Sequence, residues 1–216
     1  WVTRADGTDP VHITDESVFD ARYPAFSPDG AWVIYIKRNA ITGRDYLYRR
    51  RRDLSGPPVQ IIVPGDTSPS KYDLTFSPDG RTILYTGLIG SRKQILALPV
   101  TVTASSITAT GPAQQLTTLG ENFHPRYARD GKTIVYVCRP SSGSSALYLM
   151  DADGNNQRPV TVTPLPAFPG FPQFSPYGEQ KIMYLDGSKL WLADLTKQKA
   201  AAVSPAISTA CRFAWG

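Results

Sequence analysis

Few residues in this 216-residue chain have the types and spacing that catalysis requires. Its two histidines, His12 and His124, form no His-Glu-x-x-His motif, and Cys138 and Cys211 are not paired at zinc-ligand spacing. The chain has no Gly-x-Ser-x-Gly segment and no glycine-rich phosphate loop. A Ser–His–Asp triad is defined by geometry rather than by order, so the sequence leaves that alternative open. We therefore expect these residues to form no active site and to hold no metal and no cofactor.

The one dense run of charge is Arg49-Arg50-Arg51-Arg52. Guanidinium groups bind carboxylates and phosphates through pairs of parallel hydrogen bonds. If the run ends a strand, alternation places Arg50 and Arg52 on one face, and these two side chains are candidates for docking an anion. The alternative is a solvated turn whose arginine stems pack against their neighbours.

These residues must be positioned by a phrase that occurs four times: an aromatic residue, a tight turn closed by glycine, and an apolar run centred on tyrosine. The glycines are Gly30, Gly80, Gly131 and Gly178, and the tyrosines are Tyr35, Tyr85, Tyr136 and Tyr184. Self-similarity at a period of about 50 residues indicates a repeat architecture. In the Ser-Pro-Asp-Gly copies, proline favours the second position of a type I turn and glycine closes it. We therefore expect Asp29 and Asp79 to be structural rather than catalytic.

Short apolar runs between Gly, Asp, Pro and Ser predict four antiparallel strands in each repeat. In the third copy the expected strands are 124–127, 133–138, 146–150 and 158–161. The second and third strands are expected at 32–37 and 46–50 in the first copy, 82–88 and 94–98 in the second, and 181–185 and 190–193 in the fourth. The predicted fold is all-β: a β-propeller of four-stranded antiparallel blades, five or six in number. A linear β-solenoid is the alternative.

The whole chain, 1–216, is expected to form one propeller domain. Its predicted blades are 15–65, 66–118, 119–163 and 164–206. Residues 1–14 are expected to be the third and fourth strands of a preceding blade, and 207–216 the first strand of a further one. The ring is then either five-bladed with a gap or six-bladed with polypeptide outside this sequence.

The start of each first strand is where we expect a ligand to meet the channel. Three residues before the repeated aromatic stand Tyr23, Asp73, His124, Phe171 and Arg212, and one residue before it stand Ala25, Thr75, Arg126, Gln173 and Ala214. Both positions vary between copies, whereas the turn and core residues agree, as a heterogeneous binding surface would. We predict that a peptide or small polar ligand contacts Tyr23, Asp73, His124, Arg126, Phe171, Gln173 and Arg212. The alternative is that these positions are unconstrained and solvated.

Charge and hydropathy restrict the partners. The net charge of +5 is spread along the chain, without the basic stripe and interleaved aromatics of nucleic-acid binding. No apolar stretch approaches the 18 residues of a membrane-spanning helix. Because Cys138 and Cys211 fall in different predicted blades, we expect no disulfide between them. The sequence therefore favours a protein or peptide partner over nucleic acid or membrane insertion.

The repeated phrase, with its Ala152-Asp153-Gly154 turn leading to Val160-Thr161, resembles the WD40-like repeat of TolB-type β-propellers. Two copies keep the turn intact, the third has Ala128-Arg129 for Ser-Pro, and the fourth has Tyr177 for Asp. The resemblance implies a non-catalytic scaffold that binds a protein or peptide at the channel mouth, in the periplasm or cell envelope, within a longer chain or an envelope complex. Similar blades form the gating propeller of prolyl-oligopeptidase-like serine peptidases. The alternative function is therefore substrate filtering for a catalytic domain outside this chain.

Overall fold

A computed structural model describes residues 2–4, 6–14, 20–141, 143–162, 169–176 and 180–203. These residues form strands and no helix. The first two sheets contain β1 (Ala21–Phe26), β2 (Trp32–Arg38), β3 (Asp45–Arg51), β4 (Val59–Ile61), β5 (Lys71–Phe76), β6 (Thr82–Ile89), β7 (Arg92–Val102), β8 (Ile107–Ala109) and β9 (Gln114–Gln115). The other two contain β10 (Glu121–Tyr127), β11 (Thr133–Arg139), β12 (Ala146–Asp151), β13 (Arg158–Pro159), β14 (Pro169–Phe174), β15 (Lys181–Asp186), β16 (Lys189–Asp194) and β17 (Lys199–Ala202).

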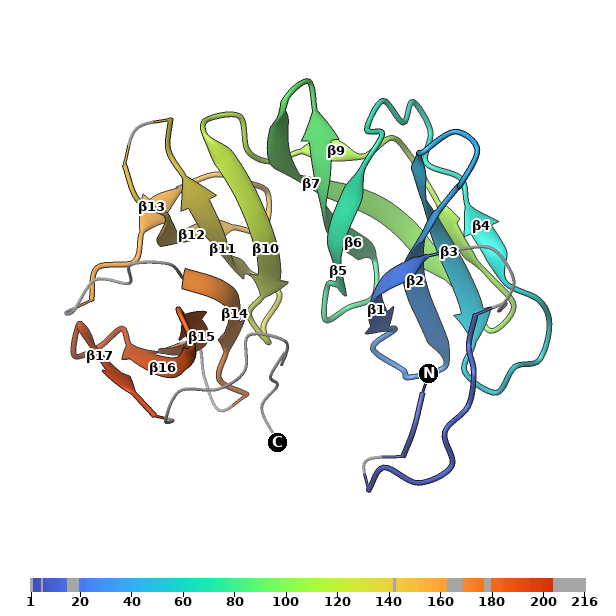
Figure 1. Ribbon diagram of the computed structural model, residues 1–216, viewed down its shortest axis with the longest axis horizontal. Coiled ribbons are helices and arrows are strands. Elements are labelled where there is room, and N and C mark those ends of the chain that lie inside the picture. The colour runs from blue at the N-terminus through green and yellow to red at the C-terminus, as the bar shows by residue number, and fades with distance from the viewer. Residues whose placement is uncertain are drawn as a thin grey trace.

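The four sheets are antiparallel, and consecutive strands pair within each, except that β9 pairs with β7. We call them blades 1 to 4: β1–β4, β5–β9, β10–β13 and β14–β17. In Figure 1 they follow one another around an arc, with β1, β5, β10 and β14 nearest its middle and β4, β13 and β17 on the outside. This arrangement confirms the predicted all-β propeller of four-stranded antiparallel blades.

The predicted turn is present in blades 1 to 3. The amide of the closing glycine donates to the carbonyl three residues earlier in Ser27–Gly30, Ser77–Gly80 and Ala128–Gly131, at 2.8, 2.9 and 3.0 Å. Gly30 has a φ of +66°, which a residue without Cβ adopts readily. The Asp29 carboxylate accepts the Ser27 hydroxyl, and secondly the Ala31 amide, and these bonds lower its pKa. Asp29 is therefore engaged in holding its turn.

The in-step tyrosines are buried and face the preceding part of the ring. Tyr85 packs in a core with residues of blade 1, Tyr136 in one with blade 2, and Tyr184 in one with blade 3. Each stands in the second strand of its blade, whose two faces are both covered, so these strands are continuous apolar runs. Burial raises the pKa of all three phenols. The regular spacing of these tyrosines thus arises because each one packs its blade against the preceding blade.

Blade 2 departs from the expected pattern through a hairpin insertion. Its predicted third strand, 94–98, extends to Val102 because β8 folds back on its outer half. The fourth-strand position is taken instead by β9, since Gln115 pairs with Leu96 as Gln60 pairs with Tyr48 in blade 1. The β7–β8 hairpin is therefore an addition to the repeat, absent from blade 1.

The segment before blade 1 contains one antiparallel bridge, between Val2 and Val11. Ile13 is buried against Val33 and Tyr35 of β2. Tyr35 thus packs against the segment before blade 1, as the equivalent Tyr85 of blade 2 packs against blade 1. The assignment of 1–14 to a preceding blade stays a prediction, as do the other blade limits, and 207–216 lies outside the described residues.

Candidate functional site

None of the described residues predicted to meet the ligand starts its strand: Tyr23, Asp73, His124 and Phe171 lie within the innermost strands, and Arg126 and Gln173 lie near the strand ends. In each of these strands the pairing register shifts at one place: between Arg22 and Ala25, Tyr72 and Thr75, Phe123 and Arg126, and Gly170 and Gln173. The third-copy strand consequently begins at Glu121 rather than at residue 124, because pairing resumes before the irregularity. The expectation that His124 starts its strand is wrong.

A left-handed residue stands at each irregularity. Tyr23, Asp73, His124 and Phe171 have φ values of +55°, +58°, +55° and +49°. For a residue with a Cβ this conformation costs about 1–2 kcal/mol. A bulge of this kind redirects side chains and tightens the local twist. Four dissimilar side chains thus share one backbone geometry, which their sequence variation concealed; Arg212 lies outside the described residues.

Three of these residues are joined across neighbouring blades. The His124 amide donates to Asp73 Oδ2 at 3.2 Å, and the Phe171 amide donates to His124 Nδ1 at 3.4 Å. The His124 and Phe171 rings are 4.0 Å apart at their centroids. Tyr23 makes an edge contact with Tyr72 of blade 2 at 6.0 Å. The predicted ligand residues therefore also tie the innermost strands together.

Asp73 carries an acceptor that the described residues leave unused. Its side chain is 3% exposed, and Oδ2 takes the His124 amide and the Thr86 hydroxyl. Oδ1 is buried with no hydrogen-bond partner, 3.7 Å from His124 Nε2. Because Nδ1 accepts a backbone amide, a neutral His124 carries its proton on Nε2. That N–H then lies close to Asp73 Oδ1, but at 3.7 Å the contact is longer than a hydrogen bond.

The second variable set converges on one hollow of about 570 Å³ at the ends of the innermost strands. Ala25, Thr75, Arg126 and Gln173, one from each blade, all line it. Its rim is formed by the turns, including Pro28, Pro78 and Arg129, and none of its lining residues is a carboxylate. Phe26, half exposed, adds apolar surface. The hollow offers two guanidinium groups within largely apolar walls.

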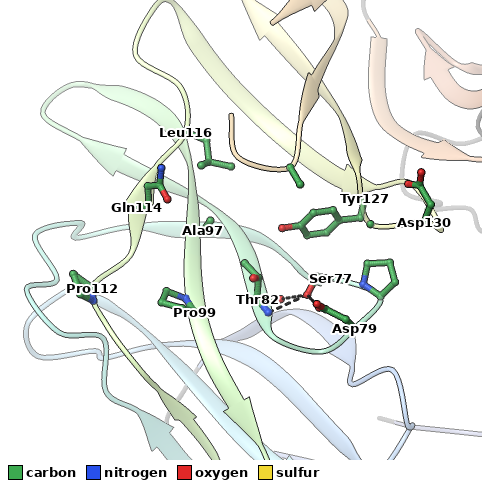
Figure 2. Close-up of a pocket in the computed structure, with 13 residues that line it drawn as sticks. Ser77, Asp79, Thr82, Ala97, Pro99, Pro112, Gln114, Leu116, Tyr127 and Asp130 are labelled. Carbon is green, nitrogen blue, oxygen red and sulfur yellow. Dashed lines mark hydrogen bonds between the residues drawn. The ribbon is translucent and has the colours of Figure 1, made fainter. Parts of the chain in front are cut away.

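Sequence reasoning missed a larger hollow of about 620 Å³ between blades 2 and 3. Figure 2 shows Tyr127 pointing into it beside the Ser77–Thr82 turn, whose hydrogen bonds are drawn. Burial raises the pKa of Tyr127 to about 12. Tyr127 is the repeated aromatic of the third copy, and this repeated position is the signal that marks the hollow.

The side chains of the arginine run point alternately to the two faces of the sheet, as predicted. On each face they have different partners. Arg50 Nη1 donates to the Ile13 carbonyl at 2.7 Å, and Arg52 is exposed. On the other face, Arg49 and Arg51 lie over the Trp32 ring at 4.9 and 5.3 Å. Among the described residues, no group of three or more His, Cys, Asp or Glu could hold a metal ion, and no helix has the length and hydropathy to span a membrane.

The fold is similar to several solved structures. TolB from Acinetobacter baumannii is 23% identical, with a TM-score of 0.68 over 90% of this chain and 45% of that one. A nidogen/laminin complex matches at 13% identity and 0.64, over 87% of this chain and 65% of that one. Puromycin hydrolase matches at 13% and 0.59, over 88% of this chain and 29% of that one. No protein-family profile and no curated protein sequence matches the chain.

The four radially arranged antiparallel blades and these likenesses define the class of the molecule as a β-propeller. Within that class its fold is TolB-like, and the chain spans less than half the length of the TolB structure. The same fold occurs in a hydrolase, so the architecture alone does not separate binding from catalysis.

Proposed function

We propose that this propeller is a non-catalytic scaffold that binds a protein or peptide partner at the channel mouth. The observation that carries the proposal is the convergence of Ala25, Thr75, Arg126 and Gln173 on one hollow. Four positions that differ between repeats meet there, whereas the turns around them are alike. A hollow with guanidinium donors and apolar walls suits a peptide that carries a carboxylate beside apolar side chains.

Asp73 and His124, which are joined by a hydrogen bond across blades 2 and 3, stay candidates for a polar contact with the partner. The TolB-type resemblance of the repeat supports a partner in the cell envelope and a periplasmic location. A second function, the gating propeller of a serine peptidase, is favoured by the likeness to puromycin hydrolase, of which this chain covers 29%. It places catalysis in polypeptide outside this sequence.

Selection of peptides from a displayed library tests the scaffold. Enriched peptides would be measured by fluorescence anisotropy against wild type, Arg126→Ala/Gln173→Ala, and the control Arg158→Ala, an exposed arginine on the outer strand β13. Loss of a charge-assisted bond should weaken binding at least about tenfold in the double variant and leave the control unchanged. Equal affinities, or no enriched peptide, would refute binding at the mouth.

A further inference from the structure

The β7–β8 hairpin, which the repeat does not require, closes a third hollow against blade 1. The Trp32 indole donates to the Thr103 carbonyl at 3.0 Å, and Arg51 Nη1 donates to the Ala104 carbonyl at 2.8 Å. Between the hairpin tip and β3 lies a hollow of about 440 Å³, lined by Trp32, Arg49 and Arg51 among others. The insertion thus builds a site that blade 1 alone would lack.

Arg49 is the unusual group in this hollow. No hydrogen bond or ion pair joins its guanidinium to any described residue, and its only directed contact is with the Trp32 ring. Its Nε is buried without an acceptor. Buried polar groups almost always have a partner, and an unmade bond costs about 1–3 kcal/mol. Arg49 Nε therefore has no acceptor among the described residues.

The neighbouring charges leave this place positive. Arg51 uses Nη2 on Asp53 at 3.2 Å, and that carboxylate is 55% exposed. Arg51 also interacts electrostatically with Asp29, whose carboxylate is held in its own turn, and the lining of the hollow contains no carboxylate. Burial also lowers the pKa of Arg49, as it does for a cation without a counter-ion. The cation–π contact with the Trp32 ring, 4.9 Å from the Arg49 Cζ atom to the ring centroid, restrains the guanidinium group.

We propose that Arg49 and Arg51 form a binding site for an oxyanion, either the phosphate or the carboxylate of a ligand that also carries an apolar group. The two guanidinium groups would bind the oxyanion, and Pro57 and the partly exposed Val59 would contact the apolar part. The site differs from the one the sequence suggested: neither Arg50 nor Arg52 lines it, and Arg50 is bound to the Ile13 carbonyl. It is also separate from the channel mouth, with which it shares no lining residue.

The Trp32 indole N–H gives a direct readout by two-dimensional ¹H–¹⁵N NMR. The chain has four tryptophans, and Trp32→Phe assigns the signal because it removes one of the indole peaks. Inorganic phosphate, phenyl phosphate and benzoate would be titrated separately at millimolar concentrations. We expect a saturable shift of the Trp32 signal with at least one probe, and tighter binding of phenyl phosphate than of inorganic phosphate. Response to the phosphates alone identifies a phosphate ligand, and response to benzoate alone a carboxylate.

Two variants and a control make the result decisive. Arg49→Gln should weaken binding at least about tenfold, since it removes a charge-assisted pair of hydrogen bonds. Arg49→Lys keeps the charge without the planar fork and should fall between wild type and Arg49→Gln. Arg158→Gln, on an outer strand, should bind as wild type does. No saturable shift with any probe, or equal affinity of Arg49→Gln and wild type, would overturn the proposal.

Discussion

Two neighbouring blade contacts use the same place in the repeat with different chemistry. Lys71 stands two residues before the left-handed Asp73 of blade 2, and Asn122 stands two residues before the left-handed His124 of blade 3. Both side chains are buried, at 0% and 1% exposure, and both reach back to the preceding blade. One is a charged group and the other a neutral amide. The comparison separates what the repeat requires at this position from what each contact adds.

The contact of blade 1 with blade 2 is ionic. Lys71 Nζ donates to Asp66 Oδ2 at 2.8 Å, to the Ser68 carbonyl at 2.7 Å and to the Asp45 carbonyl at 3.1 Å. The fully buried Asp45 carboxylate accepts the Lys71 amide at 3.0 Å and Arg22 Nη2 at 2.9 Å. Each charge is thus paired and hydrogen-bonded, as buried charges must be.

At the corresponding position, the contact of blade 2 with blade 3 uses neutral groups. Asn122 Nδ2 donates to Gln94 Oε1 at 3.1 Å and to the Leu119 carbonyl at 2.8 Å. The Thr117 hydroxyl also donates to Gln94 Oε1, at 2.7 Å, while Gln94 Nε2 donates to the Gly120 carbonyl. The difference shows that the repeat demands a satisfied polar network here, not a particular charge.

The largest expected effect is at Lys71. Lys71→Met removes the ion-pair partner of Asp66 and leaves two buried carbonyl groups without the Lys71 donor. We therefore expect the free energy of unfolding to fall by about 3–5 kcal/mol. Urea denaturation followed by fluorescence measures it. Lys132→Met, at an exposed lysine, is the control and should change stability by less than about 0.5 kcal/mol. A similar small effect at Lys71 would show that the ionic contact does not stabilise the molecule.

Asn122→Ala should lower the free energy of unfolding by about 1–3 kcal/mol, because it leaves neutral rather than charged groups unpaired. The same urea denaturation applies. A loss as large as that of Lys71→Met would mean that charge is not what distinguishes the two contacts.

Raising the pH should sharpen the comparison. Burial lowers the pKa of Lys71 below its ordinary 10.5, with Asp66 opposing the shift. Between the lowered pKa and 10.5 the unfolded chain binds more protons than the folded one, so folding becomes more favourable as the pH rises. Wild type should therefore gain stability relative to Lys71→Met, by less than about 1.4 kcal/mol per pH unit. The same denaturation at several pH values measures both differences. The difference in free energy of unfolding between wild type and Asn122→Ala should not change with pH, because both proteins keep Lys71. If the stability difference between wild type and Lys71→Met became smaller as the pH rises, it would contradict the lowered pKa of Lys71.

The smallest effect is expected at the edge of the ionic contact. Asp20 is 62% exposed and lies 3.1 Å from Arg22 Nε. Asp20→Asn should cost less than about 1 kcal/mol, and the difference should disappear in high salt, which screens exposed pairs. Thermal unfolding in low and high salt measures it. A larger, salt-independent loss would place Asp20 within the buried network.

Sequence patterns predicted the second strands to within a residue or so, because the turn phrase and the buried tyrosine mark their beginning and middle. They predicted the other strands less well. The predicted start of the innermost strand in the third copy is three residues too far along the chain. The bulge at His124 is formed by a different residue type in each blade, so no common residue marks it in the sequence. The extension of β7 was also missed, because the hairpin that lengthens it pairs with blade 2 but is held by Trp32 and Arg51 of blade 1.

By itself the sequence determined the repeat, the turns and the phase of the buried tyrosines, because these depend on backbone preferences and on hydropathy along a few adjacent residues. Which arginines have partners depends on contacts between segments that are distant in the sequence. Alternation separates Arg49 from Arg50, but the Ile13 carbonyl and the β7–β8 hairpin come from distant parts of the chain. Likewise, whether Lys71 or Asn122 is satisfied depends on groups from the preceding blade. Burial and hydrogen bonding are properties of neighbours in space, and those neighbours are set by the packing of the blades.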